Sequence, residues 1–269
     1  MRRISLIIQS TGNQHVKRLR ALATRKGRRT HRQFLVEGVR ALEEAVGGRL
    51  EPATVAICPE LIDSDRAREL ADDLARSGAQ MLEIAEEPFR SFSQVQAPEG
   101  VAAAVAIPDT TLDDLPADAA LLVAAVDLRD PGNMGALVRT ADAAGAGALI
   151  AAGTCVDLFD PKVVRATAGS IFHMPVVNDA APMDLIRWAR RAGVRTVAGC
   201  LDNAKPHTRV RYPKQALVMV GNEANGLRED VAKNADIRAY IDMPGRAESL
   251  NATVAAGILI WEILRQRSN

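Results

Sequence analysis

The sequence LLVAAVDLRDPGNMGALVRT, residues 121–140, combines an apolar run, a Pro-Gly pair and an alanine-rich segment. The run Leu121–Val126 predicts a buried strand, and the pattern from Ala136 to Ala144 predicts a helix. Pro131 and Gly132 predict a tight turn between the two. A strand, a turn and a helix in this order indicate an α/β fold, in which ligands bind at the carboxyl ends of the strands.

Two later stretches repeat the arrangement of an apolar strand that runs into a polar loop with glycine. They are VMVGNEANGL, residues 218–227, and IDMPGRAESLN, residues 241–251. In the stretch 121–140, Arg139 lies about one helical turn past Gly135, where a guanidinium suits an anion such as phosphate. Because all three loops follow strands of one predicted domain, we expect them to form a single site.

The alternation of apolar runs and amphipathic segments predicts two α/β domains. Residues 1–107 form the first, residues 108–118 form a linker with little periodicity, and residues 119–269 form the second. In the second domain, strands are expected at 121–126, 148–152, 196–200, 216–220 and 239–243, and helices at 136–144, 161–168, 183–192 and 249–267. This order predicts parallel strands joined by crossover helices.

The first domain is expected to be a smaller α/β unit. Its strands are predicted at 33–38, 54–58, 80–84 and 100–107, and its helices after residue 13 and at 39–46, 64–77 and 88–92. Residues 25–32 are expected to be a basic connection.

Charge is unevenly distributed along the chain. The net charge is +1, but between Met1 and Arg40 only Glu37 opposes eleven Lys and Arg residues. Such a segment is typical of contact with a nucleic-acid backbone, although the same charges could form a solvated helix face. The candidate RNA contacts are Lys17, Arg18, Arg25, Lys26, Arg28 and Arg29.

Several classes of protein are excluded by missing patterns. Cys58, Cys155 and Cys200 lie far apart, which argues against a disulfide framework or a zinc site and fits a reducing cytoplasm. No stretch has the length or apolar character of a signal peptide or a membrane span, so no membrane partner is expected. The sequence lacks GxGxxG after the first strand, GxxxxGK[ST], GxSxG and HExxH, so ordinary dinucleotide, P-loop, hydrolase and zinc-protease sites are not expected.

With these three loops, the chain resembles the SpoU family of RNA 2′-O-ribose methyltransferases, within the SPOUT superfamily. The matching motifs are residues 130–140, 221–227 and 241–251, with Asn222 standing where many relatives carry Ser or Ala. In the first domain, Ser10, Asn13, Val16, Lys17 and residues 34–38 resemble the substrate-binding domain of ribosomal RNA members.

The resemblance implies a parallel-sheet SPOUT domain with a deep trefoil knot, beside a smaller N-terminal L30e-like RNA-binding domain. Topological rules alone would argue against a knot. It also implies a homodimer, and S-adenosyl-L-methionine as the cofactor. The residues that it assigns to the cofactor are Gly221, Ile241, Met243 and Leu250, with the backbone near Gly199, Cys200 and Leu201.

The catalytic residues that the resemblance assigns are Arg139, Asn133, Glu223, Ser249 and Asn251. It gives Arg139 the role of a general base or of an alkoxide stabiliser. Because a free Arg has a pKa of about 12.5–13.8, stabilisation is favoured over proton abstraction. The separate N-terminal domain favours 23S ribosomal RNA as the substrate. Transfer RNA is the alternative substrate, and a non-catalytic RNA-binding protein on the same scaffold is the alternative function.

Overall fold

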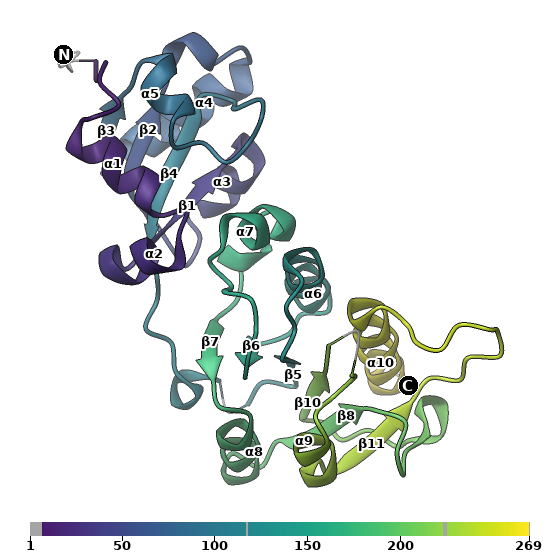
Figure 1. The fold of residues 1–269 in the computed structure, drawn as a ribbon. Helices are drawn as coiled ribbons and strands as arrows, with labels where there is room; N and C mark the ends of the chain where they lie inside the picture. Colours follow the sequence, from purple (N-terminus) through teal and green to yellow (C-terminus); the bar gives the residue numbers. More distant parts are fainter. Residues whose placement is uncertain (1–6, 117, 223–224, 269) are drawn as a thin grey trace. The chain divides into compact units, whose positions relative to one another are not determined.

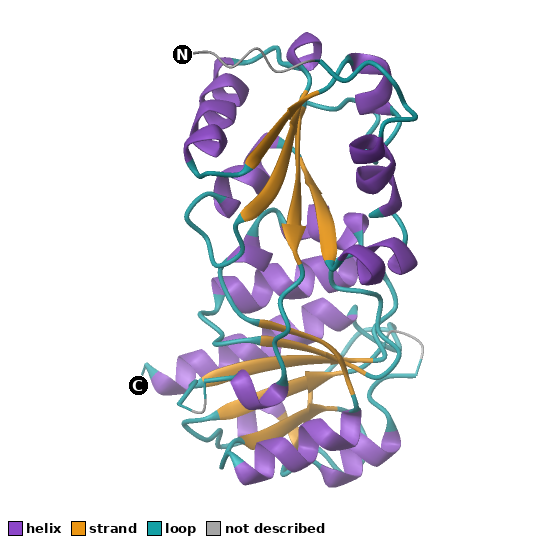
Figure 2. Cartoon of the chain, turned by 90° about the vertical axis from the view of Figure 1, so that its left-hand side faces the viewer, coloured by secondary structure: helices purple, strands orange, loops and turns teal. Residues whose placement is uncertain are grey.

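The structure of the chain, a computed structural model, describes residues 7–116, 118–222 and 225–268. These residues form two units. The first contains the described residues up to Pro108 together with Phe159–His173, and the second contains Asp109–Leu158 and the described residues from Met174 onward. Figure 2 shows the strands gathered into two separate sheets, each with helices against it. None of the helices in the described ranges combines the length and the apolar character that crossing a bilayer requires.

The second unit is built on a seven-stranded parallel sheet with the order β7-β6-β5-β10-β8-β11-β9 (Figure 1). Every residue of β5 and β10 is buried, as is typical of parallel strands covered on both faces. The α/β fold expected from the sequence is therefore confirmed. The strands are β5 (Leu121–Val126), β6 (Leu149–Ala152), β7 (Val176–Ala180), β8 (Arg195–Gly199), β9 (Lys205–Pro206), β10 (Ala216–Val220) and β11 (Ile237–Tyr240).

Two pairs of helices cover this sheet. Helix α10 (Ala252–Arg267) packs on α6 (Pro131–Ala143) and on β10. Helix α8 (Pro182–Arg191) packs on α9 (Glu229–Asn234) and on β8. Apolar side chains of α8 and α9 join those of the sheet in one buried cluster.

Helix α6 begins five residues earlier than expected. Asp130 is its N-cap, because its side chain accepts a hydrogen bond from the Asn133 backbone N–H at 2.7 Å. Pro131 occupies the first helical position, where its missing N–H costs nothing. The prediction of a tight turn at Pro131 and Gly132 is therefore wrong, since both residues lie in the first turn of the helix.

Other boundaries in the second unit also differ from the prediction. Helix α10 begins at Ala252 rather than residue 249, because the Asn251 side chain caps the backbone N–H groups of Thr253 and Val254. The short elements β7, β9 and α9 were not expected. The physical reason is their length or composition: β9 has two residues, α9 has six, and β7 contains the polar pair Asn178-Asp179 before its last residue, Ala180.

The first unit contains a mixed four-stranded sheet with the order β1-β4-β2-β3. Strand β4 runs antiparallel to both β1 and β2, whereas β2 and β3 are parallel. The strands are β1 (Gln33–Glu37), β2 (Pro52–Ile57), β3 (Gln80–Glu83) and β4 (Val101–Ala106). The helices are α1 (Gln14–Ala21), α2 (Arg25–His31), α3 (Val39–Ala45), α4 (Asp65–Arg76), α5 (Glu86–Arg90) and α7 (Pro161–Thr167).

Residues 25–31 are a helix rather than the expected basic connection. Thr24 caps α2 by accepting a hydrogen bond from the Gly27 backbone N–H at 3.0 Å. Arg32 ends the helix in the left-handed conformation, with a φ of 51°. The cap at Thr24 was the local signal for this helix, but the run of charges concealed it.

The segment Phe159–His173 packs with the first unit, although it lies between strands of the second in the sequence. The ring of Phe34 in β1 lies 4.9 Å from that of Phe159 and 6.4 Å from that of Phe172, measured between centroids. All three rings are almost fully buried. This aromatic cluster explains the position of the segment, which the sequence analysis had placed in the second domain.

Candidate functional site

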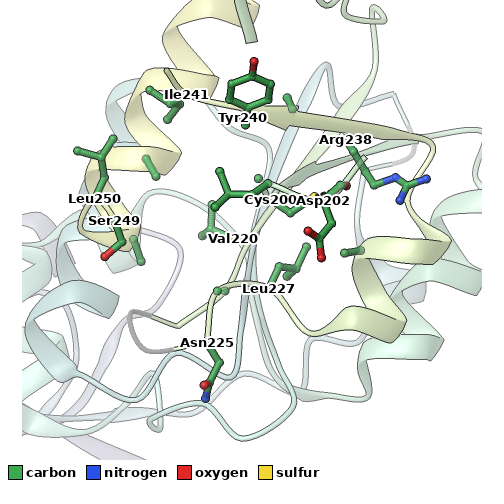
Figure 3. A pocket seen from close by; sticks show the side chains of 18 of the residues that line it. Cys200, Asp202, Val220, Asn225, Leu227, Arg238, Tyr240, Ile241, Ser249 and Leu250 are labelled. Carbon is green, nitrogen blue, oxygen red and sulfur yellow. Dashed lines mark hydrogen bonds between the residues drawn. The ribbon is translucent and has the colours of Figure 1, made fainter. Parts of the chain in front are cut away.

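A cavity of about 880 Å³ lies at the carboxyl ends of β8, β10 and β11 in the second unit. This volume is within the range of ordinary cofactor sites. Its walls come from the loops after β8, β10 and β11, from α9 and from the first half of α10 (Figure 3). Parallel strands bring these loops to one edge of the sheet. Two of the three motif loops expected to form one site, after β10 and β11, line this cavity, whereas the first motif, residues 130–140, is not part of its wall.

The loop after β10 is tightly closed. Asn222 and Gly226 exchange backbone hydrogen bonds of 3.1 and 3.0 Å, and the Asn225 N–H donates to the Asn222 side-chain oxygen at 2.8 Å. Gly221 has no room for a side chain, because a Cβ atom there would lie 1.9 Å from the Gly226 carbonyl oxygen. Glu223 lies outside the described residues.

The structure brings together all seven residues that the resemblance assigns to the cofactor. The cavity is lined by Gly199, Cys200, Leu201, Gly221, Ile241, Met243 and Leu250. Val220, Leu227 and Leu259 add further apolar surface to it. An apolar wall beside exposed backbone groups suits an adenine ring, so the residues present fit an adenosyl cofactor.

Two of the proposed catalytic residues contact each other. The Asn251 side-chain N–H donates to the Asn133 side-chain oxygen at 2.7 Å. The Thr253 hydroxyl donates to the Asn133 backbone carbonyl at 2.9 Å. These bonds connect the start of α6 to the start of α10. Thr253 was not expected at the site, and only its position two residues after the third motif could have indicated it.

Only one of the proposed catalytic residues that the structure describes lines the cavity. Ser249 lines the cavity, whereas Asn133, Asn251 and Arg139 are not part of its wall. Arg139 is exposed on α6 and forms no hydrogen bond or ion pair with the described residues. Its guanidinium is therefore available to a ligand.

Arg228, which follows the loop after β10, lies between two carboxylates. The Arg228 guanidinium lies 3.9 Å from the Asp127 carboxylate and 2.6 Å from that of Asp230. The hydrogen bond to Arg228 lowers the pKa of Asp230. Asp127 has a φ of 56° and accepts a hydrogen bond from the Thr154 N–H at 2.6 Å. Asp127 and Arg228 thus connect the loop after β5 to the loop after β10.

The cavity also has charged walls that the sequence analysis did not identify. Asp202, Arg228, Glu229, Lys233, Arg238 and Glu248 all contribute to them. Asp202 directly follows the segment 199–201, and this adjacency was the available signal. Arg238 lies within a strand, where sequence alone does not show which way a side chain faces.

The six candidate RNA contacts in the first unit divide into five exposed residues and one buried residue. Exposed residues of α1 and α2 are Lys17, Arg18, Arg25, Lys26 and Arg29. Arg28 is only 2% exposed. Its guanidinium donates to the carbonyls of Leu22 at 3.0 Å and Ala23 at 3.1 Å, and it lies 3.4 Å from Asp160. The structure therefore corrects the prediction for Arg28, which is a buried structural residue and not a surface contact for RNA.

No group of three or more His, Cys, Asp or Glu side chains in the described ranges is arranged to hold a metal ion. The three cysteines are free. Burial raises the pKa of the Cys155 thiol to about 11 and that of Cys58 to about 12. These two thiols are therefore protonated at neutral pH and unsuited to nucleophilic attack.

Comparisons with known proteins identify similar families and structures. A model of the SpoU rRNA Methylase family matches residues 120–261, and one of the MRM3-like substrate binding domain matches residues 13–103. The 23S rRNA (guanosine(2553)-2′-O)-methyltransferase RlmP of Bacillus subtilis is 33% identical, over 95% of this chain and 98% of the relative. The 23S rRNA (uridine(2479)-2′-O)-methyltransferase of Streptomyces viridochromogenes is 32% identical, over 95% of this chain and 91% of the relative.

A solved structure is similar along the whole chain. The AdoMet-bound rRNA methyltransferase from Sinorhizobium meliloti superposes with a TM-score of 0.85 and 33% identity. The match covers 97% of this chain and 98% of that one. The likeness therefore extends through both units and is not confined to the sheet that carries the cavity.

Proposed function

Because this chain belongs to the SpoU rRNA methylase family, we propose that it methylates the ribose 2′-hydroxyl of a nucleotide in 23S ribosomal RNA, with S-adenosylmethionine as donor. The observation that carries this proposal is the position of all seven cofactor candidates around one cavity, two of whose loops carry family motifs. Two relatives modify different nucleotides, guanosine and uridine.

Residues of the cavity would bind the cofactor through apolar contacts and main-chain groups. Gly199, Gly221 and Leu250 place backbone beside it, and Ile241 and Met243 add apolar surface. S-adenosylmethionine, when bound, supplies an electrophilic methyl group on a sulfonium. The task of the protein is then to align a ribose hydroxyl with that methyl group, and such alignment can account for much of the rate.

The remaining candidates act on the ribose. We infer that Arg139 stabilises the developing alkoxide, because a guanidinium needs no change of protonation to do so. Asn133 and Asn251, which hydrogen-bond to each other, fix the position of the first and third motifs. Ser249 is the candidate that lines the cavity itself. Glu223 keeps its proposed role of maintaining the second loop in register.

RNA recognition is assigned to the first unit. Exposed cations on α1 and α2, namely Lys17, Arg18, Arg25, Lys26 and Arg29, would contact the phosphate backbone. The match of residues 13–103 to a substrate-binding domain supports this division of labour. Residues 1–107 and 119–269 thus keep their proposed roles, with Phe159–His173 added to the first unit.

We also infer three properties at the level of the whole molecule. Residues 254–261 of helix α10 are all apolar, yet Trp261 and Val254 are 48% and 50% exposed, which supports a homodimer that covers this face. The three free cysteines fit a reducing cytoplasm. In the sheet, β8 lies between β10 and β11, yet α10, which follows β11 in the chain, packs on β10. This return of the chain supports the deep trefoil knot.

The experiment that tests the proposed function is binding and transfer with the full chain. Calorimetry should show binding of S-adenosylmethionine, and binding of NAD or ATP alone would exclude the assignment. Methyl transfer should occur on 23S ribosomal RNA and not on transfer RNA. Transfer to transfer RNA alone would favour the alternative substrate. Tight RNA binding without any transfer would indicate the non-catalytic alternative.

A further inference from the structure

Two charged residues at one end of the cavity have no partner among the described residues. Asp202 follows β8, Arg238 lies in β11, and both line the cavity. Neither side chain forms a hydrogen bond or ion pair with the described residues. By contrast, Arg228 is paired with Asp230, and Lys233 with Glu229.

Asp202 and Arg238 lie near the same atom. Burial raises the pKa of the Cys200 thiol, the Arg238 charge opposes this rise, and the Asp202 charge adds to it. Figure 3 shows both side chains at the end of the cavity away from Ser249 and Leu250. A cation and an anion therefore stand together beside the segment 199–201, one of the segments assigned to the adenosyl group.

The sulfonium of S-adenosylmethionine carries three different groups, which need three different surroundings. The adenosyl group suits the apolar wall of the cavity. The methyl group must face the ribose, near Ser249. The third group is an amino-acid chain that ends in an ammonium and a carboxylate. Both of these charges are costly to bury without partners, so each needs an opposite charge.

We propose that Asp202 and Arg238 bind the amino-acid end of S-adenosylmethionine. The ammonium donates hydrogen bonds to the Asp202 carboxylate, and the Arg238 guanidinium donates to the carboxylate of the cofactor. This inference rests on the proposed function, since it assumes that the cavity binds this cofactor. Glu248 is the third charged wall residue for which the described part of the chain offers no partner; it adjoins Ser249 in sequence and is assigned no part in this binding.

The test compares ligands with and without the amino-acid end. Calorimetry on the full chain uses S-adenosylmethionine, S-adenosylhomocysteine and 5′-methylthioadenosine, which keeps the adenosyl group but lacks the amino-acid chain. Arg238→Ala and Asp202→Asn should each weaken the first two ligands about tenfold or more, as expected for loss of a charged hydrogen bond. Affinity for 5′-methylthioadenosine should stay within about twofold of the wild type.

Arg187→Ala is the matched control, because it removes an exposed arginine of the second unit that lies outside the cavity wall and is already paired with Asp184. It should change none of the three affinities. Glu248→Gln tests the other unpaired carboxylate in the wall. If Glu248→Gln weakens S-adenosylmethionine and Asp202→Asn does not, the ammonium binds at the other end and the proposal is wrong.

Two further results would overturn the proposal. An equal loss for all three ligands would show that the substitutions disturb the whole cavity. Unchanged cofactor affinity with weaker RNA binding in Arg238→Ala would assign Arg238 to a phosphate of the substrate. Failure of the proposed function has a different signature, because the wild-type protein would then bind none of the three ligands.

Discussion

At the residue scale, the hydrogen bond between Asn133 and Asn251 joins positions 118 residues apart in the sequence. Each asparagine by itself is an ordinary turn or cap residue, and Asn251 does cap α10. The family motifs predicted that both belong to the site. They could not predict the bond between them, nor the part of Thr253, because such contacts depend on how α10 packs on α6.

Replacement of Arg139 tests the assigned catalytic group. Arg139→Ala should lower the single-turnover rate about 10²–10³-fold, as is typical for loss of one group that stabilises an oxyanion. Cofactor affinity and stability should change little, because Arg139 is exposed and lies outside the cavity wall. Arg139→Lys should restore little activity, since lysine lacks the planar fork. Near-wild-type turnover in Arg139→Ala would contradict the assignment, and a parallel loss of cofactor binding would make Arg139 structural.

Gly221 offers a test of the cavity by shape alone. In Gly221→Ala the new Cβ would lie 1.9 Å from the Gly226 carbonyl oxygen, so the loop after β10 must move. We expect affinity for S-adenosylmethionine to fall about tenfold or more in calorimetry. The control is Gly245→Ala in the loop after β11, where a Cβ meets no atom within 4 Å. Equal affinities in the two variants would show that the loop does not contact the cofactor.

At the element scale, the sequence predicted long buried strands better than short or capped elements. The prediction for Leu121–Val126 agrees with β5 residue for residue, because a continuous apolar run has one stable place in a parallel sheet. The two-residue β9 carries no such pattern. Helix α2 was missed because its charges hid a Thr cap. The burial of Arg28 follows from contacts with Leu22, Ala23 and Asp160, and Asp160 is 132 residues away.

The neighbours Arg28 and Arg29 in α2 should differ in how much stability the same substitution removes. Arg28→Ala leaves buried carbonyls and Asp160 without their partner, and should lower the free energy of unfolding by about 2 kcal/mol or more. Arg29→Ala should change that free energy by less than about 0.5 kcal/mol, because Arg29 is exposed. Urea denaturation followed by circular dichroism measures both values. Equal destabilisation of the two variants would refute the structural role of Arg28.

RNA affinity provides the complementary measurement on α2. Simultaneous replacement of Arg25, Lys26 and Arg29 by Ala should weaken RNA binding. It should also make the logarithm of the binding constant fall less steeply with the logarithm of the salt concentration. Affinity for S-adenosylmethionine should stay unchanged, because the cavity is built entirely from residues of the second unit. An unchanged salt slope would mean that these cations are a solvated helix face.

At the scale of the whole molecule, one segment belongs to a different structural unit from the residues that flank it in the sequence. Phe159–His173 leaves the second unit and packs with the first through Phe159 and Phe172. A sequence read in order assigns such a segment to its neighbours, because the ring of Phe34 in β1, against which it packs, lies more than a hundred residues earlier. For the same reason a fragment of residues 119–269 would expose this aromatic cluster, and the full chain is the proper material for binding experiments.

The exposed apolar face of α10 predicts how the chains associate. Trp261→Glu should shift the mass in sedimentation velocity from that of a dimer to that of a monomer, because it places a charge where Trp261 is 48% exposed. Val46→Glu in the first unit is the control, since Val46 is similarly exposed at 38%. A wild-type monomer at micromolar concentration, or a dimer unaffected by Trp261→Glu, would contradict the proposed homodimer.

The most direct test of the central claim is the chemical position of the transferred methyl group. Purified full-length protein is incubated with 23S ribosomal RNA and S-adenosylmethionine that carries a labelled methyl group, and the RNA is digested to nucleosides for mass spectrometry. The account predicts one labelled nucleoside with the methyl group on its ribose 2′-oxygen, and loss of that product with Arg139→Ala. A methyl group on a base, or no labelled nucleoside although the cofactor binds, would contradict it.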